Sequence, residues 1–312
     1  MIDLHYDLLS ILYYSYVKND FSYVETIQQR IKESGVTGVV ANLYFMNENE
    51  MKEELGEYYK PIDVVEMFRI ATSLFPKYFP DLDVVYSIEG CDYISGPDQL
   101  EELYHLGLRN ILLVWNNPNR YGSGNRGDYG LTELGKEFLN RAIDLGISID
   151  LSHMNHKTFY DTVEVLKEAR RHGKDVVVMA SHSNCYSLCN HPRNLDDNQI
   201  LALKEFSPII GLVSYGPFVS SNENMEELKK QYVMHIRHVK ELLGVDCVAV
   251  STDDMKFDPE FLGGEDDIQV FSYQRVRNEI EMLLKKNDFS DTEINQILYQ
   301  NSYQKLFRRL LK

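Results

Sequence analysis

Eight short apolar runs rich in Val, Ile and Leu recur along the chain, and they constrain its fold more than any other feature. They cover residues 2–7, 35–45, 83–90, 109–115, 147–153, 175–183, 208–216 and 247–253. Continuous apolar runs of this length are typical of strands buried on both faces, as in parallel sheets. Most of the gaps between them carry helical periodicity. Eight strands alternating with helices predict an α/β fold, a (β/α)8 TIM barrel.

The expected helices lie at residues 21–34, 62–75, 98–107, 132–146, 157–173, 198–206 and 225–244, and the tail after residue 270 is helical too. These extra C-terminal helices could pack on the barrel or serve a partner. No Pro/Gly/Ser-rich linker and no repeat of 20 to 50 residues divides the chain, so we expect a single domain over residues 1–312. A doubly wound open sheet is the alternative, but no Gly-x-Gly-x-x-Gly turn follows the first strand. The Gly-rich segment 121–130 follows the fourth strand instead, and we interpret it as a loop over the site.

The formal charge of −16 argues against nucleic acid and against an anionic membrane as partners, because both attract basic surfaces. The N-terminus shows no basic region followed by an apolar run, and no stretch reaches the roughly 18 apolar residues of a membrane span. We therefore expect a cytoplasmic protein. The four cysteines form no Cys-x-x-Cys pair, which favours buried free thiols.

Acidic and histidine side chains end five of the predicted strands, which is the arrangement that a hydrolytic metal centre needs. They are His5, Asp7, Glu89, His153, His182 and Asp253. His5 and Asp7 are two residues apart and would share one face of their strand. Imidazole nitrogen and carboxylate oxygen suit Zn²⁺, with Mn²⁺, Co²⁺ or Fe²⁺ as alternatives. Because the two metals of such hydrolases lie roughly 3.5 to 4 Å apart, one carboxylate can bridge them, and Glu89 is our candidate.

The other histidines fit structural roles better. His235 and His238 are three residues apart on one predicted helix and share a face, but no third ligand is evident beside them. The remaining four are expected to be surface or capping residues: His105, His156, His172 and His191.

With these residues assembled, the chain resembles a bacterial member of the membrane dipeptidase family (renal dipeptidase, peptidase family M19), of the metal-dependent amidohydrolase superfamily. The motifs that carry the resemblance are His5-x-Asp7, IEG at 88–90, GLTELGKEF from 130, IDLSH ending at 153, SHSNCYSLCNHPRNLDD at 181–197 and the Asp-containing eighth strand. Their order along the chain is more specific than any one of them.

The resemblance implies a (β/α)8 barrel with two Zn²⁺ ions. It places His5 and Asp7 on one metal and His153 and His182 on the other, with Glu89 bridging the two.

The resemblance also implies roles in substrate handling. Arg193 matches the arginine that receives the C-terminal carboxylate of the substrate, a role that suits a bidentate guanidinium. Asp253 matches the catalytic carboxylate that accepts the proton of the attacking water and passes it to the leaving amine.

Two positions depart from the family pattern. Where family members carry a histidine after the fourth strand, this chain has Trp115. The pair Trp115-Asn116 resembles a Trp-Asn version of the motif found among bacterial relatives. Asn116 is the candidate for the oxyanion donor that the histidine would have supplied. After the eighth strand, the usual Gly-x-Asp-Phe-Asp-Gly becomes STDDMK, which keeps Asp253 and changes the following loop.

The resulting hypothesis is a dinuclear zinc dipeptidase that cleaves small dipeptides and tolerates a D-residue on the C-terminal side, as in L-Ala-D-Ala or L-Leu-D-Ala. The alternatives are a metal hydrolase acting on a lactone, a cyclic amide or an N-acyl amino acid, and a non-catalytic barrel. The long segment after Asn42 is expected to be a pocket wall or lid, or an exposed loop. The family also suggests a homodimer.

Overall fold

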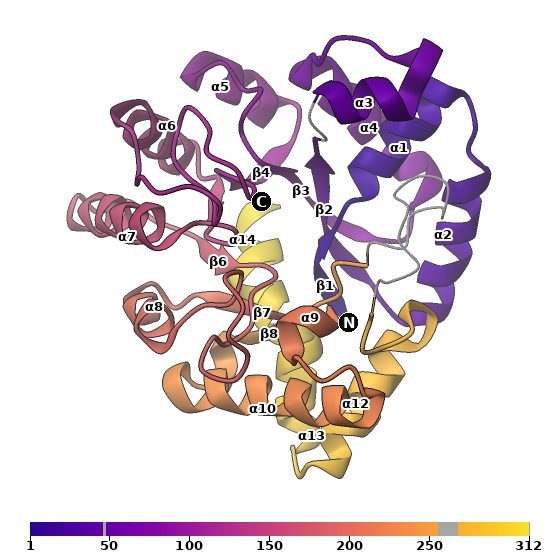
Figure 1. Cartoon of the computed structure of the whole chain (residues 1–312), viewed down its shortest axis with the longest axis vertical. Helices are drawn as coiled ribbons and strands as arrows, with labels where there is room; N and C mark the ends of the chain where they lie inside the picture. Colours follow the sequence, from indigo (N-terminus) through magenta and orange to yellow (C-terminus); the bar gives the residue numbers. More distant parts are fainter. Residues whose placement is uncertain (46–47, 255–267, 312) are drawn as a thin grey trace.

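Eight parallel strands form one nearly closed barrel in the computed structural model, which describes residues 1–45, 48–254 and 268–311 (Figure 1). The strands pair in chain order and are β1 (Ile2–Tyr6), β2 (Gly38–Tyr44), β3 (Asp83–Glu89), β4 (Leu108–Leu112), β5 (Ser148–Asp150), β6 (Val178–Ala180), β7 (Ile209–Val213) and β8 (Val248–Ser251). Each overlaps one of the eight apolar runs, with β4 beginning one residue before its run, so the predicted (β/α)8 barrel is confirmed. That residues 1–312 form a single domain stays a prediction.

Helices surround the strands (Figure 1). They are α1 (Leu8–Lys18), α2 (Ser22–Ser34), α3 (Glu48–Leu55), α4 (Val64–Tyr78), α5 (Pro97–His105), α6 (Glu133–Asp144), α7 (His156–Arg171), α8 (Asp197–Ala202), α9 (Gly216–Val219), α10 (Met225–Leu243), α12 (Val276–Lys286), α13 (Asp291–Asn295) and α14 (Arg308–Leu310). Shorter helical turns are η1 (Gly56–Tyr58), η2 (Lys204–Phe206), η3 (Val245–Cys247), η4 (Tyr273–Arg275), η5 (Gln296–Gln300) and η6 (Tyr303–Phe307). The seven helices predicted before the tail are confirmed, whereas α1, α3 and α9 were not predicted.

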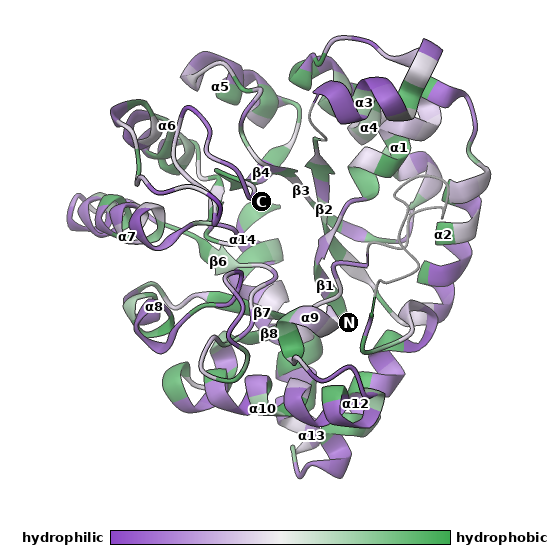
Figure 2. Cartoon of the chain, viewed as in Figure 1, coloured by the Kyte–Doolittle hydropathy of each residue, from purple (hydrophilic) through white to green (hydrophobic). Residues whose placement is uncertain are grey.

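The outer helices bury one face and leave the other polar. In α6, the Thr132 hydroxyl caps the first turn by accepting a hydrogen bond from the Gly135 amide at 3.0 Å. Phe138 and Ala142, four residues apart, then face the barrel and are buried. Figure 2 shows the hydrophilic residues of α6 and α7 turned away from the strands. Apolar burial on one face therefore holds these helices against the sheet.

Helix α1 lacks this pattern, because Leu8 through Ser15 are all buried. A helix that is apolar on most sides shows no 3.6-residue alternation, which explains why the sequence did not reveal it. It ends at Asn19, whose φ of 51° is left-handed and whose amide donates to the Tyr16 carbonyl at 3.1 Å.

The last helical turns of the chain, η6 and α14, close the end of the barrel at which the strands begin. Figure 1 shows this segment, drawn in yellow, crossing behind the centre of the ring of strands. Its apolar side chains pack with residues of several strands in one buried cluster: Leu306, Phe307 and Leu310 with Ile2, Leu4, Val40, Val85, Met179, Ile209 and Ala249. These residues therefore pack on the barrel, which is one of the two roles predicted for the C-terminal helices.

The seam between β8 and β1 is held partly by side chains. The Asp3 carboxylate accepts hydrogen bonds from the Thr252 amide at 2.9 Å and from the Thr252 hydroxyl at 2.6 Å. One residue further along, the Asp253 amide donates to the His5 carbonyl at 3.2 Å. The seam therefore joins two strand ends that both carry candidate site residues.

Within the described ranges, no helix is both long and apolar enough to cross a membrane.

Replacing Leu306 by Ala should lower the free energy of unfolding by about 2–5 kcal/mol, because it leaves a cavity beneath the strands. Leu311→Ala, on the same segment but at a half-exposed position, is the matched control and should cost less than about 0.5 kcal/mol. Urea unfolding measures both, and equal effects would show that the segment does not seal the barrel.

Candidate metal centre

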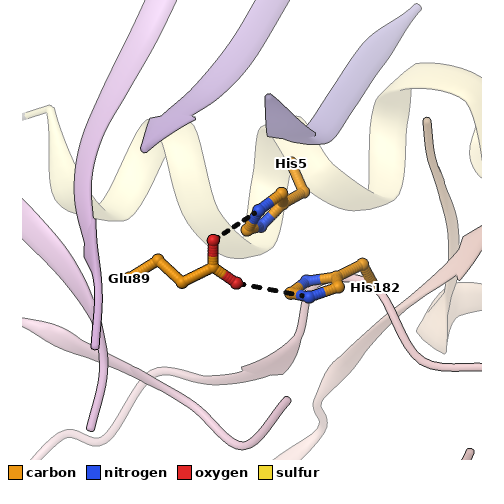
Figure 3. Close-up of side chains that lie close together, drawn as sticks. All are labelled: His5, Glu89 and His182. Carbon is orange, nitrogen blue, oxygen red and sulfur yellow. Dashed lines mark ion pairs between the residues drawn. The ribbon is translucent and has the colours of Figure 1, made fainter. Parts of the chain in front are cut away.

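The Glu89 carboxylate lies at the centre of the predicted site, between three imidazoles. One oxygen is 3.2 Å from His5 Nε2, and the other is 2.9 Å from His153 Nε2 and 3.5 Å from His182 Nε2. Figure 3 shows the carboxylate between the His5 and His182 rings. These side chains come from the ends of β1, β3, β5 and β6, where the mouth of a barrel brings strand ends together.

Asp7 and Asp253 lie on the His5 side of the cluster. Their Oδ1 atoms are 3.7 and 3.8 Å from His5 Nε2. Asp7 lies one residue beyond the end of β1, at the first turn of α1, yet its carboxylate reaches the same space as His5. Two groups of potential ligand atoms result, His5 with Glu89 and His182, and His5 with Asp7 and Asp253.

The backbone turns sharply where the strands deliver these residues. His153 and Asp253 have φ values of 72° and 47°, in the left-handed region that residues other than glycine seldom adopt. Gly90, directly after β3, has a φ of 83°. Such strain persists only where surrounding contacts enforce it, and it is common at functional sites.

The buried charges shift the pKa values of the cluster. Burial disfavours the His5 imidazolium, but the charges of Glu89, Asp253 and Asp7 outweigh burial and raise the pKa of His5 to about 10. Burial and the Glu89 charge raise the pKa of Asp7 well above its usual value. Burial and the Arg193 charge lower the pKa of His153 to about 3. The raised pKa values of His5 and Asp7 reflect burial together with the excess of negative charge in this space.

These features fit divalent cations. His153 Nε2 and His182 Nε2 face each other at 2.9 Å, and two nitrogen lone pairs at that separation repel unless a proton or cation lies between them. Asp7 Oδ1 is buried without a hydrogen-bond partner among the described residues. Nitrogen and carboxylate donors of this kind are typical ligands of Zn²⁺.

Further polar groups orient the imidazoles from behind. Asn116 Oδ1 lies 2.9 Å from His153 Nδ1 and can accept a hydrogen bond from a proton on that nitrogen, which directs the Nε2 lone pair toward Glu89. The Ser181 hydroxyl lies 2.7 Å from His182 Nδ1 and 3.4 Å from His5 Nδ1. Sequence reasoning missed Ser181, although its position directly before a candidate ligand was a signal.

Arg193 is buried beside the cluster. Its side chain is 6% exposed, and its Nη2 atom has no hydrogen-bond partner among the described residues. Burial lowers the pKa of Arg193 to about 10, while the charges of Glu89 and Asp253 oppose that shift. A buried guanidinium with an unused donor is suited to bind an anionic group of a ligand.

Trp115 follows β4 and forms an aromatic wall next to His153. Its ring centroid is 5.1 Å from that of Tyr44 and 5.9 Å from that of His153. The Gly-rich segment passes directly over it: a Cβ on Gly124 would lie 1.7 Å from the Trp115 carbonyl oxygen, so only glycine fits. The Arg126 guanidinium lies 6.0 Å from the Trp115 ring.

His235 anchors the loop that carries His182 and Arg193. It is fully buried, accepts a hydrogen bond from the Cys185 amide at 3.1 Å and lies 2.9 Å from the Val219 carbonyl. It is therefore neutral, with its proton on Nε2. The predicted structural role of His235 agrees with this position, and His238 pairs with Asp197 at 2.8 Å.

The segment after Asn42 is partly helical. Residues 46–47 lie outside the described residues, and α3 follows with Met51 and Leu55 buried against the core. Whether the segment acts as a lid stays a prediction. The predicted changed loop after Asp253 also lies largely outside the described residues, from 255 to 267.

A model of the family "Membrane dipeptidase (Peptidase family M19)" matches residues 1–309. The chain belongs to this family. The resemblance inferred from the strand-end motifs is thereby confirmed.

Curated proteins with similar sequences match parts of the chain. A curated protein of Acinetobacter calcoaceticus, described as an uncharacterized protein in the PQQ-III 3′ region, is 36% identical over 140 residues, or 42% of each chain. The match spans less than two thirds of that relative and of two further ones, at 42%, 65% and 36% of their lengths.

Solved structures share the fold. The metallopeptidase called dipeptidase AC superposes with a TM-score of 0.75 at 21% identity, covering 99% of this chain and 97% of its own. A metallopeptidase from Rhodobacter sphaeroides, solved with a phosphinate mimic of the dipeptide L-Ala-D-Ala, gives 0.73 at 20% identity, covering 99% and 98%.

Zinc should stabilise the protein, because a ligand that binds only the native state adds about 2.7 kcal/mol at 100 times its Kd. After chelator treatment, saturating zinc is expected to raise Tm by about 5 °C. Glu89→Gln should lose most of this shift, whereas Glu133→Gln, at a position with 86% side-chain exposure, should retain it. A full shift in Glu89→Gln, measured by differential scanning fluorimetry, would contradict the proposed centre.

Stability should also depend on pH through His235. Burial lowers the pKa of His235 to about 4, against about 6.5 in the unfolded chain. The unfolded state then binds a proton that the native state does not, so stability falls as pH drops from about 6.5 toward 4. Between pH 7.5 and 5 this one group should remove about 2 kcal/mol.

His235→Gln cannot take up that proton. The advantage of the wild type over His235→Gln in urea unfolding should therefore shrink by the same amount over this pH range. A difference that does not change with pH would show that His235 is not held neutral.

Proposed function

We propose that the protein is a dinuclear zinc dipeptidase that hydrolyses the peptide bond of small dipeptides. One observation carries the proposal: the buried Arg193 guanidinium, one donor of which has no partner among the described residues, lies beside a carboxylate and imidazole cluster suited to metals. A hydrolytic centre next to a fixed anion-binding group suits a substrate that has a carboxylate close to the bond to be cleaved.

His5 and Asp7 would hold one cation, and His153 and His182 the other, with Glu89 bridging. When bound, such cations supply Lewis acidity to the carbonyl and lower the pKa of water. The Nδ1 contacts of His153 with Asn116 and of His182 with Ser181 support this assignment, because each leaves Nε2 facing Glu89.

Asp253 would accept the proton of the attacking water and deliver it to the leaving amine. Its carboxylate, 15% exposed and 3.8 Å from His5 Nε2, can exchange protons at the metal side while remaining reachable by the substrate. Glu89 would assist catalysis because its carboxylate contributes negative charge to the cluster.

Arg193 would bind the C-terminal carboxylate of the dipeptide and fix its distance from the scissile carbonyl. A longer peptide has no carboxylate at that distance, so this contact would select dipeptides. Trp115 would form a wall of the substrate pocket together with Tyr44, and the amide of Asn116 would donate to the developing oxyanion.

A D-residue on the C-terminal side is the finer part of the proposal. The phosphinate mimic of L-Ala-D-Ala bound by the structurally similar Rhodobacter sphaeroides peptidase supports testing this substrate first. Location in the cytoplasm and a homodimer stay predictions.

A panel of L-Ala-L-Ala, L-Ala-D-Ala and L-Leu-D-Ala, their C-terminal amides and N-acetyl forms, together with an N-acyl amino acid and a lactone, tests the function. The free dipeptides should be cleaved in a reaction that chelation abolishes, while the amides should be poor substrates. Cleavage of N-acyl amino acids or lactones with no cleavage of any dipeptide would contradict the proposal and favour the alternative metal hydrolase.

Arg193→Gln should lower kcat/KM for the preferred free dipeptide about 100-fold, since it removes charge-assisted hydrogen bonds worth about 1.5–3 kcal/mol each. The corresponding dipeptide amide is the matched control, because it lacks the carboxylate, and the substitution should change its cleavage little. Equal losses for acid and amide would mean that Arg193 does not bind this carboxylate.

A further inference from the structure

Asp253 adopts an unusual backbone conformation that its neighbours must enforce. Its φ of 47° is left-handed, and aspartate has no intrinsic preference strong enough to hold it there. On one side, Thr252 is tied to Asp3 by two hydrogen bonds. The Asp253 amide is itself tied to the His5 carbonyl at 3.2 Å.

The other neighbour, Asp254, is tied by a charge pair. Its carboxylate forms an ion pair with Arg30 of α2, and the two side chains are 3% and 12% exposed. The Arg30 guanidinium also lies 5.5 Å from the Tyr273 ring centroid, and Tyr6 packs against Tyr273 at 5.0 Å. Both aromatic rings are buried, so the pair lies in a largely apolar environment where water screens it weakly.

The two consecutive aspartates therefore point in different directions. Asp253 faces the cluster at the mouth, whereas Asp254 faces α2 behind the strand ends. A rigid anchor on Asp254 restricts the rotation of the backbone that carries Asp253. The anchor is also a departure from the family pattern, because Asp254 stands where the pattern has phenylalanine.

We propose that Arg30 is a positioning residue for Asp253: by holding Asp254, it fixes the left-handed turn that aims the Asp253 carboxylate at the metal centre. The inference rests on the proposed function only in its kinetic part, where Asp253 carries protons. Its geometric part concerns the conformation of Asp253 and stands without any activity.

The kinetic test compares Arg30→Gln, Arg30→Lys, Asp254→Asn and the double variant Arg30→Gln/Asp254→Asn on the preferred dipeptide. Arg30→Gln should lower kcat about 10- to 100-fold, because a misplacement of about 1 Å can cost that much, with KM changed less than about twofold. Arg30→Lys should recover part of kcat. The double variant should be no worse than Arg30→Gln, since both changes break one anchor.

Arg69→Gln is the matched control. Arg69 is a helix arginine paired with Glu66 at 3.0 Å, but its side chain is 51% exposed and lies on α4, away from the β8–β1 seam. The kcat of the Arg69→Gln variant should equal that of the wild type. If Arg30→Gln lowers Tm but leaves kcat unchanged, the pair only supports folding and the proposal is overturned.

The geometric test is a crystal structure of Arg30→Gln beside the wild type. We expect Asp253 to leave the left-handed region and its carboxylate to move away from His5 Nε2. An unchanged Asp253 would overturn the proposal even if no dipeptide is cleaved, and absent cleavage by the wild type would overturn the proposed function alone. If Arg30→Gln does not fold, the nearly isosteric Asp254→Asn carries both tests.

Discussion

Three carboxylates share one buried space at the mouth of the barrel, and their mutual repulsion is the constraint on which the rest of the site depends. Asp7, Glu89 and Asp253 all approach His5 Nε2 to within 3.8 Å. In a weakly screening environment such a cluster is costly unless positive charge offsets it. The pKa values of His5 and Asp7 are both raised in this environment, and divalent cations would offset its negative charge.

Apolar packing and the charged groups lie at opposite ends of the barrel. Near the start of several strands, apolar side chains such as Ile2 and Val85 lie in one buried cluster with Phe307 of the C-terminal segment. The candidate ligands lie at or just beyond the other ends of their strands. Burial of apolar surface at one end thus supplies stability, while the other end can hold strained turns and like charges.

The seam between β8 and β1 serves both the stability of the barrel and the assembly of the site. Asp3 holds Thr252, and His5 holds the Asp253 amide, so the strand that delivers two potential ligands also fixes the last strand. Arg30 extends the same arrangement outward to α2. Closure of the barrel and assembly of the site are therefore parts of one structural feature.

Much of this could be predicted from the sequence. Apolar runs located all eight strands, because parallel strands buried on both faces leave a simple signal. His5, Glu89 and His153 were visible because ligands end strands. The candidate ligands come together as expected, while their roles in binding metal remain to be tested.

Other features left no such signal. Helix α1 shows no alternation because it is buried on most sides. Arg30 and Asp254 are 224 residues apart, and nothing in either local sequence reveals that they meet. Ser181 and Asn42 act on the far side of the imidazoles, so their relevance depends on side-chain direction and not on spacing.

We propose that Glu89 bridges two cations held by separate groups of ligands. Anomalous diffraction at the zinc absorption edge, from crystals of the full chain grown with zinc, would locate these cations. We expect two anomalous peaks roughly 3.5 to 4 Å apart, one beside His5 and Asp7 and one beside His153 and His182, with Glu89 between them. A single peak, or peaks that do not contact Glu89, would contradict it.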